Sequence, residues 1–73
     1  MEVILSGITP RLKQLRKERH VTQKDMAELL GKTERHYQDI EAGRINVPAL
    51  TLIALSEYFH VSIDYLLGRS DLR

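Results

Sequence analysis

The side chains best suited to chemistry lie in one short segment, TERHYQDIE, at positions 33–41. Arg35 can donate two parallel hydrogen bonds, which matches the O6 and N7 acceptors of guanine, and Glu34 or Asp39 can accept from the N4 amino group of cytosine. Gln38 supplies both a donor and an acceptor. This set could read the edge of one G·C pair or of adjacent pairs. The same residue types also occur on a solvated helix face, where Glu34 would only complement the positive helix N-terminus.

Two short helices are predicted to hold these residues, over about 23–30 and about 34–42. Thr22 can cap the first helix, and Asp25, three residues on, can complete a short version of a capping box. Gly31 can end this helix because glycine tolerates a positive φ.

The second helix has boundary signals of its own, with Thr33 at its start and Gly43 at its end. The apolar residues of both segments recur at helical spacing, and they are Met26, Ala27, Leu30, Tyr37 and Ile40. Two short helices joined by a turn that contains glycine form the DNA-binding helix-turn-helix, here residues 22–42. On spacing alone, an ordinary helical hairpin fits equally well.

Three further helices are predicted around this motif. The first runs over about 9–19, with Pro10 at the first helical position. Another, over 48–59, is apolar almost all round and is predicted to be the central helix of the core. Ser62 can cap a last short helix, which Gly68 ends. The sequence therefore predicts an all-α fold of five helices.

The helix-turn-helix domain is predicted to span residues 8–68. Residues 1–7 form an N-terminal extension without helical period, and residues 69–73 are expected to be a frayed C-terminal tail. His20 and His60 each end a helix, where histidine tolerates a positive φ better than most residues. This role is favoured over metal binding because the histidines lack metal-ligand spacing.

Composition limits the classes of function. The chain has 73 residues, no cysteine and a net charge of +1, which indicates one small domain without disulfides or thiolate metal sites. No Ser/His/Asp set, glycine-rich phosphate loop or paired carboxylates appears, so we expect no enzyme, cofactor or metal. No segment could span a membrane, and a cytoplasmic protein is expected. Basic residues concentrate in positions 1–20, where they could face phosphates or form a solvated helix face.

The chain resembles the Cro/CI-type helix-turn-helix family, also called the XRE family. The segments that carry this resemblance are RLKQLRKER, VTQKDMAELLG, TERHYQDIEAGR and LIALSEYFHVSIDYLLGRSD. The resemblance implies the five-helix lambda-repressor-like fold, whose third helix enters the major groove of double-stranded DNA. It further implies a transcriptional regulator, most often a repressor that binds a palindromic operator as a dimer. Lys32 and Tyr37 depart from the family's usual aliphatic residues, so the contact between the two motif helices could be repacked.

The resemblance also assigns roles in DNA contact. It places Thr33, Glu34, Arg35 and Asp39 at base-reading or groove-lining positions, and Gln38 lies on the same side of the helix. Gln23 matches a phosphate contact at a helix start, where backbone N–H groups favour an anion. Further candidates for phosphate contact are Lys24, Lys32, His36, Arg44 and Asn46. Either lysine, Lys24 above all, could equally be a solvated surface residue.

Two structural roles follow from the same resemblance. Arg16 and Glu41 are expected to form an ion pair that ties the first helix to the end of the third, although they could also be two unrelated surface charges. Dimerisation is expected through the C-terminal helices. The candidates for that contact are Tyr58, Tyr65, Leu66 and Leu67.

A second function hypothesis comes from a different class. The third helix is unusually acidic, so the chain could be an antitoxin or a protein-interaction module that binds a toxin or an antirepressor. Loss of a basic face in the folded structure would favour this alternative over a DNA-binding repressor.

Overall fold

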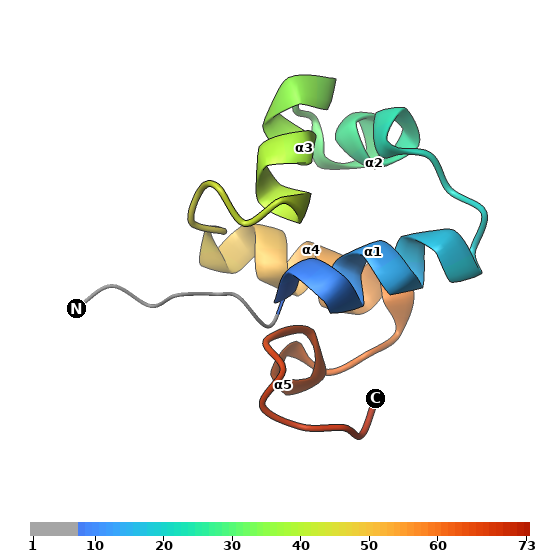
Figure 1. The fold of residues 1–73 in the computed structure, drawn as a ribbon, viewed down its shortest axis with the longest axis vertical. Coiled ribbons are helices and arrows are strands. Elements are labelled where there is room, and N and C mark those ends of the chain that lie inside the picture. The colour runs from blue at the N-terminus through green and yellow to red at the C-terminus, as the bar shows by residue number, and fades with distance from the viewer. Residues whose placement is uncertain (1–7) are drawn as a thin grey trace.

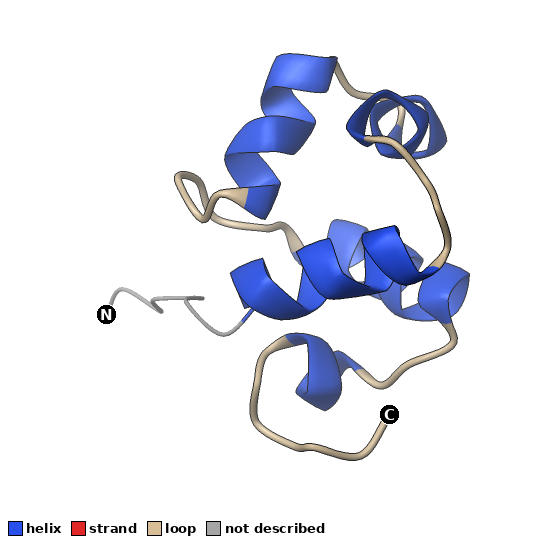
Figure 2. Ribbon diagram, turned by 45° about the vertical axis from the view of Figure 1, so that its right-hand side comes forward, coloured by secondary structure: helices blue, strands red, loops and turns tan. Residues whose placement is uncertain are grey.

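Figure 1 shows the computed structural model of the chain, which describes residues 8–73. The helices are α1 (Ile8–Glu18), α2 (Gln23–Leu30), α3 (Glu34–Glu41), α4 (Ala49–Phe59) and α5 (Ile63–Leu66). Residues 8–73 form no strand (Figure 2), and the predicted all-α architecture of five helices is confirmed. The predicted extension at residues 1–7 lies outside the described residues. Within residues 8–73, no helix has the length and apolar character needed to cross a membrane.

One apolar core joins the five helices. α1 and α4 lie across the middle of the molecule, with α2 and α3 on one side and α5 on the other (Figure 1). Each helix contributes a fully buried side chain, and these include Leu12, Met26, Ile40, Leu55 and Leu66. Because burying such a side chain is worth about 1.5–3 kcal/mol, this cluster fixes α3 against the rest of the domain.

The predicted caps of the two motif helices are confirmed. The Thr22 hydroxyl accepts a hydrogen bond from the Asp25 N–H at 3.1 Å, and the Asp25 carboxylate accepts the Thr22 N–H at 3.1 Å. This is the reciprocal geometry of a capping box. Thr33 caps α3 by accepting the His36 N–H at 3.0 Å. The starts of α2 and α3 are therefore fixed in sequence by side-chain caps at Thr22 and Thr33.

Each helix is followed by a residue with a left-handed backbone, and these residues are His20, Gly31, Gly43, His60 and Gly68. The prediction for the two histidines is confirmed, with φ of 56° at His20 and 55° at His60. The N–H of the next residue then bonds back to the last helical turn, as the Arg44 N–H does to the Asp39 carbonyl at 2.9 Å. This pattern supplies hydrogen-bond donors to carbonyl groups of the last helical turn that have no partner within the helix.

α4 is not buried on all sides, which corrects the prediction for this helix. Its buried residues are Thr51, Leu55 and Phe59, whereas Leu50 is 80% exposed and Ile53 is 43% exposed. A domain of this size has too few elements to surround one helix completely. The second apolar face of α4 therefore remains at the surface, where contact with another molecule can bury it.

The C-terminal tail is docked on α1 and α5, so the prediction of a frayed end is wrong. Arg11 donates hydrogen bonds to the Tyr65 carbonyl at 3.0 Å and to the Asp71 carboxylate at 2.7 Å. Arg73 donates two hydrogen bonds to the Glu18 carboxylate, at 2.8 and 2.7 Å. Both guanidinium groups lie over the Tyr65 ring, 4.3 and 5.3 Å from its centre. Contacts between residues so far apart in the sequence produce no local pattern from which the docking could be predicted.

Docking of the tail can be tested at one amide group. The Ser62 N–H donates to the Arg73 carbonyl at 2.8 Å, so its hydrogen exchange reports on the tail. Arg11→Ala removes the donor that holds the returning chain and should speed exchange at Ser62 by about tenfold or more. Lys13→Ala, at an exposed position of the same helix, is the control and should leave this amide protected. A Ser62 amide that exchanges freely in the unchanged chain would contradict a docked tail.

Candidate nucleic-acid interface

A buried ion pair connects α1 to the end of α3. The Arg16 Nε donates to one oxygen of the Glu41 carboxylate at 2.9 Å, and a terminal nitrogen donates to the other oxygen at 3.0 Å. A third hydrogen bond runs from Arg16 to the Val21 carbonyl at 3.0 Å. The side chains are only 13% and 5% exposed. The geometry favours the ion pair over two unrelated surface charges, and it fixes α3 relative to the start of α2.

The electrostatics of this pair involve Tyr37, which is fully buried beside it. Burial is the largest single influence on the pKa of Glu41 and raises it, but the hydrogen bonds and positive charge of Arg16, together with neighbouring donors, outweigh burial and hold that pKa below its ordinary value. The Glu41 carboxylate in turn raises the pKa of Arg16. Burial raises the pKa of Tyr37 far above its ordinary value, and its hydroxyl makes no hydrogen bond of regular geometry among residues 8–73. Arg16 and Glu41 are therefore both charged at neutral pH.

α3 presents its first turn to solvent. Glu34, Arg35 and His36 are exposed, and the Arg35 side chain reaches 83% exposure. Gln38 and Asp39 are only half-buried, on the same side. The expectation that Arg35 lies on an exposed face of α3 is confirmed. An arginine this exposed has its terminal nitrogens available to donate to a ligand.

The other predicted base contact on this helix start is Thr33. Its hydroxyl oxygen accepts the capping hydrogen bond, and its O–H remains available as a donor. Thr33 therefore serves as a helix cap in the free chain, in addition to the contact expected of it.

Asp39 is not a free carboxylate. Arg44 donates to its Oδ1 at 3.1 Å, and the Nε of Arg35 lies 3.8 Å from the same oxygen. With Glu41 paired to Arg16, Glu34 is the acid of α3 that forms no ion pair among residues 8–73. The acidic character of α3 seen in the sequence is thus largely neutralised by neighbouring arginines.

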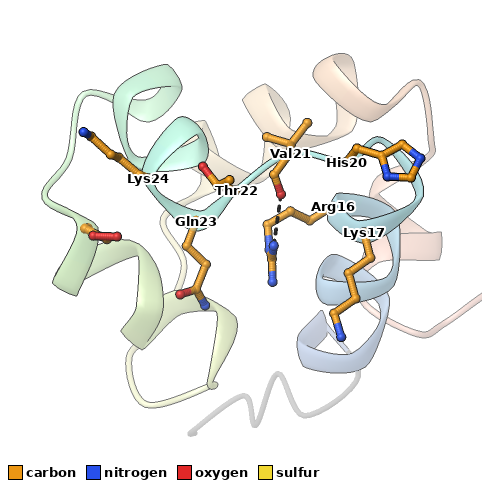
Figure 3. Close-up of a pocket in the computed structure, with 8 residues that line it drawn as sticks. Arg16, Lys17, His20, Val21, Thr22, Gln23 and Lys24 are labelled. Atoms are coloured by element: carbon orange, nitrogen blue, oxygen red, sulfur yellow. Dashed lines mark hydrogen bonds between the residues drawn. The ribbon is translucent and has the colours of Figure 1, made fainter.

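An open pocket of about 490 Å³ lies where the end of α1 meets the starts of α2 and α3 (Figure 3). Its lining is mostly basic or polar, and we call it the basic pocket. The lining residues are Arg16, Lys17, His20, Val21, Thr22, Gln23, Lys24 and Glu34. In Figure 3, the side chains of Arg16, Lys17 and Gln23 extend in the same direction. Backbone N–H groups at the start of α2 add positive potential. The pocket can therefore accept an anion such as a phosphate.

Lys17 and His20 are members of this pocket that the sequence analysis did not include among the contacts. The sequence feature that could have indicated them is the concentration of basic residues in positions 1–20, which ends just before the start of α2. The predicted contacts Gln23 and Lys24 also line the pocket. The remaining candidates lie outside it, and they are Lys32, His36, Arg44 and Asn46.

The predicted dimer residues divide into two groups. Leu66 is fully buried in the core, and Tyr65 is 7% exposed because Arg11 and Arg73 cover its ring. Neither can form an exposed dimer face, which corrects the prediction for these two residues. Tyr58 and Leu67 are partly exposed.

Comparison with known proteins identifies the class of this fold. The HTH_3 helix-turn-helix family model matches residues 12–66, so the chain belongs to this helix-turn-helix family. The resemblance to Cro/CI-type proteins and the lambda-repressor-like fold are thereby confirmed. No match to a solved structure reaches significance.

Two curated proteins of Bacillus subtilis (strain 168) are similar to the chain. The uncharacterised HTH-type transcriptional regulator YobD is 38% identical over 61 residues, which cover 84% of this chain and 54% of YobD. The uncharacterised HTH-type transcriptional regulator YqaE is 43% identical over 56 residues, which cover 77% of this chain and 48% of YqaE. The chain thus spans about half the length of these curated relatives.

Proposed function

We propose that this chain is the DNA-binding part of a transcriptional regulator and reads double-stranded DNA by placing α3 in the major groove. The observation that carries the proposal is the pairing of two features at one end of the molecule. Arg35 is 83% exposed at the start of α3, and the basic pocket lies at the start of α2. The first feature suits base recognition and the second suits a phosphate.

The buried ion pair supports the same proposal. Arg16 lines the pocket and also binds Glu41 at the end of α3, so one residue connects the phosphate site to the recognition helix. Phosphate contacts fix the register of such a module, and base contacts then specify sequence. The Arg16–Glu41 link between the phosphate site and α3 would therefore place Arg35 at a fixed depth in the groove.

A dimeric repressor is the form of this function that we favour. A module with few phosphate contacts and a net charge of +1 binds weakly alone, and a second copy doubles the contacts. Two copies would match a palindromic operator with half-sites about one helical turn apart. The exposed apolar face of α4 around Leu50 and Ile53 is the surface we propose for their contact.

The test is a selection of binding sites from random double-stranded DNA at low salt. We expect a palindromic preference and, with about six phosphates neutralised, a slope of log affinity against log salt of about −5. Arg35→Ala should cost about 1–3 kcal/mol and relax preference at one base pair per half-site. Gln23→Ala should weaken binding to all sequences alike.

Lys13→Ala controls for the loss of one positive charge, because Lys13 is exposed on α1 outside the basic pocket. It should change affinity less than Arg35→Ala does and should leave base preference unchanged. A chain that selects no sequence, yet captures a protein partner through α3, would overturn the proposal in favour of an interaction module. The basic pocket and the paired acids of α3 favour DNA over that alternative.

A further inference from the structure

The position of Asp39 on α3 differs from what a base-reading residue needs. It lies four residues, or about 6 Å, beyond Arg35 along the helix axis. In a recognition helix the N-terminal residues reach the base edges, so a residue further along lies further from them. Its side chain is 23% exposed, against 83% for Arg35. Asp39 is therefore recessed behind the arginine that extends towards the ligand.

Asp39 is held in this recessed position by Arg44. Gly43, with a φ of 74°, turns the chain at the end of α3 and brings Arg44 back towards the helix. The Arg44 N–H donates to the Asp39 carbonyl at 2.9 Å, and the Arg44 guanidinium donates to the Asp39 carboxylate at 3.1 Å. Backbone and side chain of Arg44 thus both bind the same residue, and the carboxylate has a fixed place.

The same carboxylate oxygen lies 3.8 Å from the Nε of Arg35. An exposed pair of this kind contributes little to the stability of the free chain. Its effect would grow in a DNA groove, because exclusion of water strengthens the interaction between close charges. Arginine is also long and flexible, and restricting it before binding lowers the entropy lost on contact. Because the nearest approach is at Nε, the terminal nitrogens of Arg35 remain free to donate to a base.

We propose that Asp39 is a positioning residue that orients Arg35 for base recognition, rather than a residue that reads a base itself. The inference rests on the proposed function, because it assigns a role within the same DNA contact. It also accounts for an acidic residue on a surface that must approach phosphates. Arg44 and Arg35 together neutralise that acid.

The experiment repeats the selection from random DNA with Asp39→Ala, Arg35→Ala and the double variant, after melting curves have shown that all are folded. Arg35→Ala identifies the base pair that Arg35 reads. Asp39→Ala should reduce preference at that same base pair by about fivefold to tenfold, and the double variant should relax it no further than Arg35→Ala does. Affinity for non-operator DNA should rise, because one negative charge is removed.

Glu28→Ala is the charge-matched control, since Glu28 is exposed on α2 outside the basic pocket. It should raise non-operator affinity without changing base preference. Relaxation at a different base pair, additive with that of Arg35→Ala, would show that Asp39 reads a base and would overturn the inference. Unchanged preference in Asp39→Ala would overturn it as well. A wild-type chain that selects no sequence would overturn the proposed function, and this inference with it.

Discussion

Replacing Glu41 by alanine is expected to lower the free energy of unfolding by about 3 kcal/mol. The substitution leaves the Arg16 guanidinium, 13% exposed, without the carboxylate that it binds at 2.9 and 3.0 Å. In a domain of this size, such a loss corresponds to a fall of about 12–24 °C in melting temperature. Thermal and urea melts of the single variants Glu41→Ala and Arg16→Ala measure the change in melting temperature and in the free energy of unfolding.

The double variant and a neighbouring substitution provide the controls. Arg16→Ala combined with Glu41→Ala should lose less than the sum of the two single losses, because no buried charge then remains unpaired. Tyr37→Phe removes a buried hydroxyl beside the pair that makes no regular hydrogen bond, so it should change stability by less than about 1 kcal/mol. Single losses that are additive and each below about 1 kcal/mol would show that the pair contributes nothing.

The pair also makes stability depend on pH. The pKa of Glu41 in the folded chain lies below the ordinary value of 4.5. The stabilising contribution of this carboxylate is therefore complete above pH 4.5 and is lost as pH falls through the lower pKa of the folded state. Between neutral pH and about pH 3, the unchanged chain should lose more stability than Glu41→Ala loses. An equal loss in both would contradict this account.

Boundary signals of the motif were well predicted because they depend on residues close in sequence. Thr22 and Asp25 are three residues apart, and a capping box needs only that spacing and its side-chain oxygens. His20 and His60 were predicted to adopt a positive φ from their position at a helix end alone. The Arg16–Glu41 pair, 25 residues apart, came from family resemblance, since local spacing carries no information about it.

Features that depend on the packing of distant segments were not predicted. The sequence of α4 is apolar on nearly every side, so it cannot indicate that Leu55 is buried while Leu50 is exposed. The docked tail depends on Arg11 and Arg73, which have no unusual local context. His20 was assigned only a backbone role, because its place in the basic pocket depends on how α1 and α2 pack.

Replacing Leu50 by aspartate is expected to convert the proposed dimer to a monomer and to weaken binding to a full operator. Leu50 is 80% exposed on α4, and Ile53, three residues on, is 43% exposed on the same helix. Burial of a leucine side chain is worth about 2 kcal/mol, so two copies contribute about 4 kcal/mol. This corresponds to about a thousandfold in the dimer dissociation constant. Sedimentation and titration of full and half operators measure the two effects.

The folding of the single chain separates this effect from simple damage. Since Leu50 already faces solvent in the monomer, Leu50→Asp should leave the free energy of unfolding nearly unchanged at low protein concentration. Binding to a half operator should also be unchanged, because α3 and the basic pocket are untouched. Affinity for the full operator should fall towards that of the half operator, since two modules no longer bind as a unit.

Leu72 supplies a matched control for the same chemistry. It is 82% exposed, as Leu50 is 80% exposed, but it lies in the C-terminal tail instead of on α4. Leu72→Asp therefore adds the same charge and removes the same apolar side chain at equal exposure. If dimers persist in Leu72→Asp and are lost in Leu50→Asp, the contact lies on α4. Loss of dimers in both variants would indicate a general effect of charge, and dimers that persist in Leu50→Asp would place the contact elsewhere.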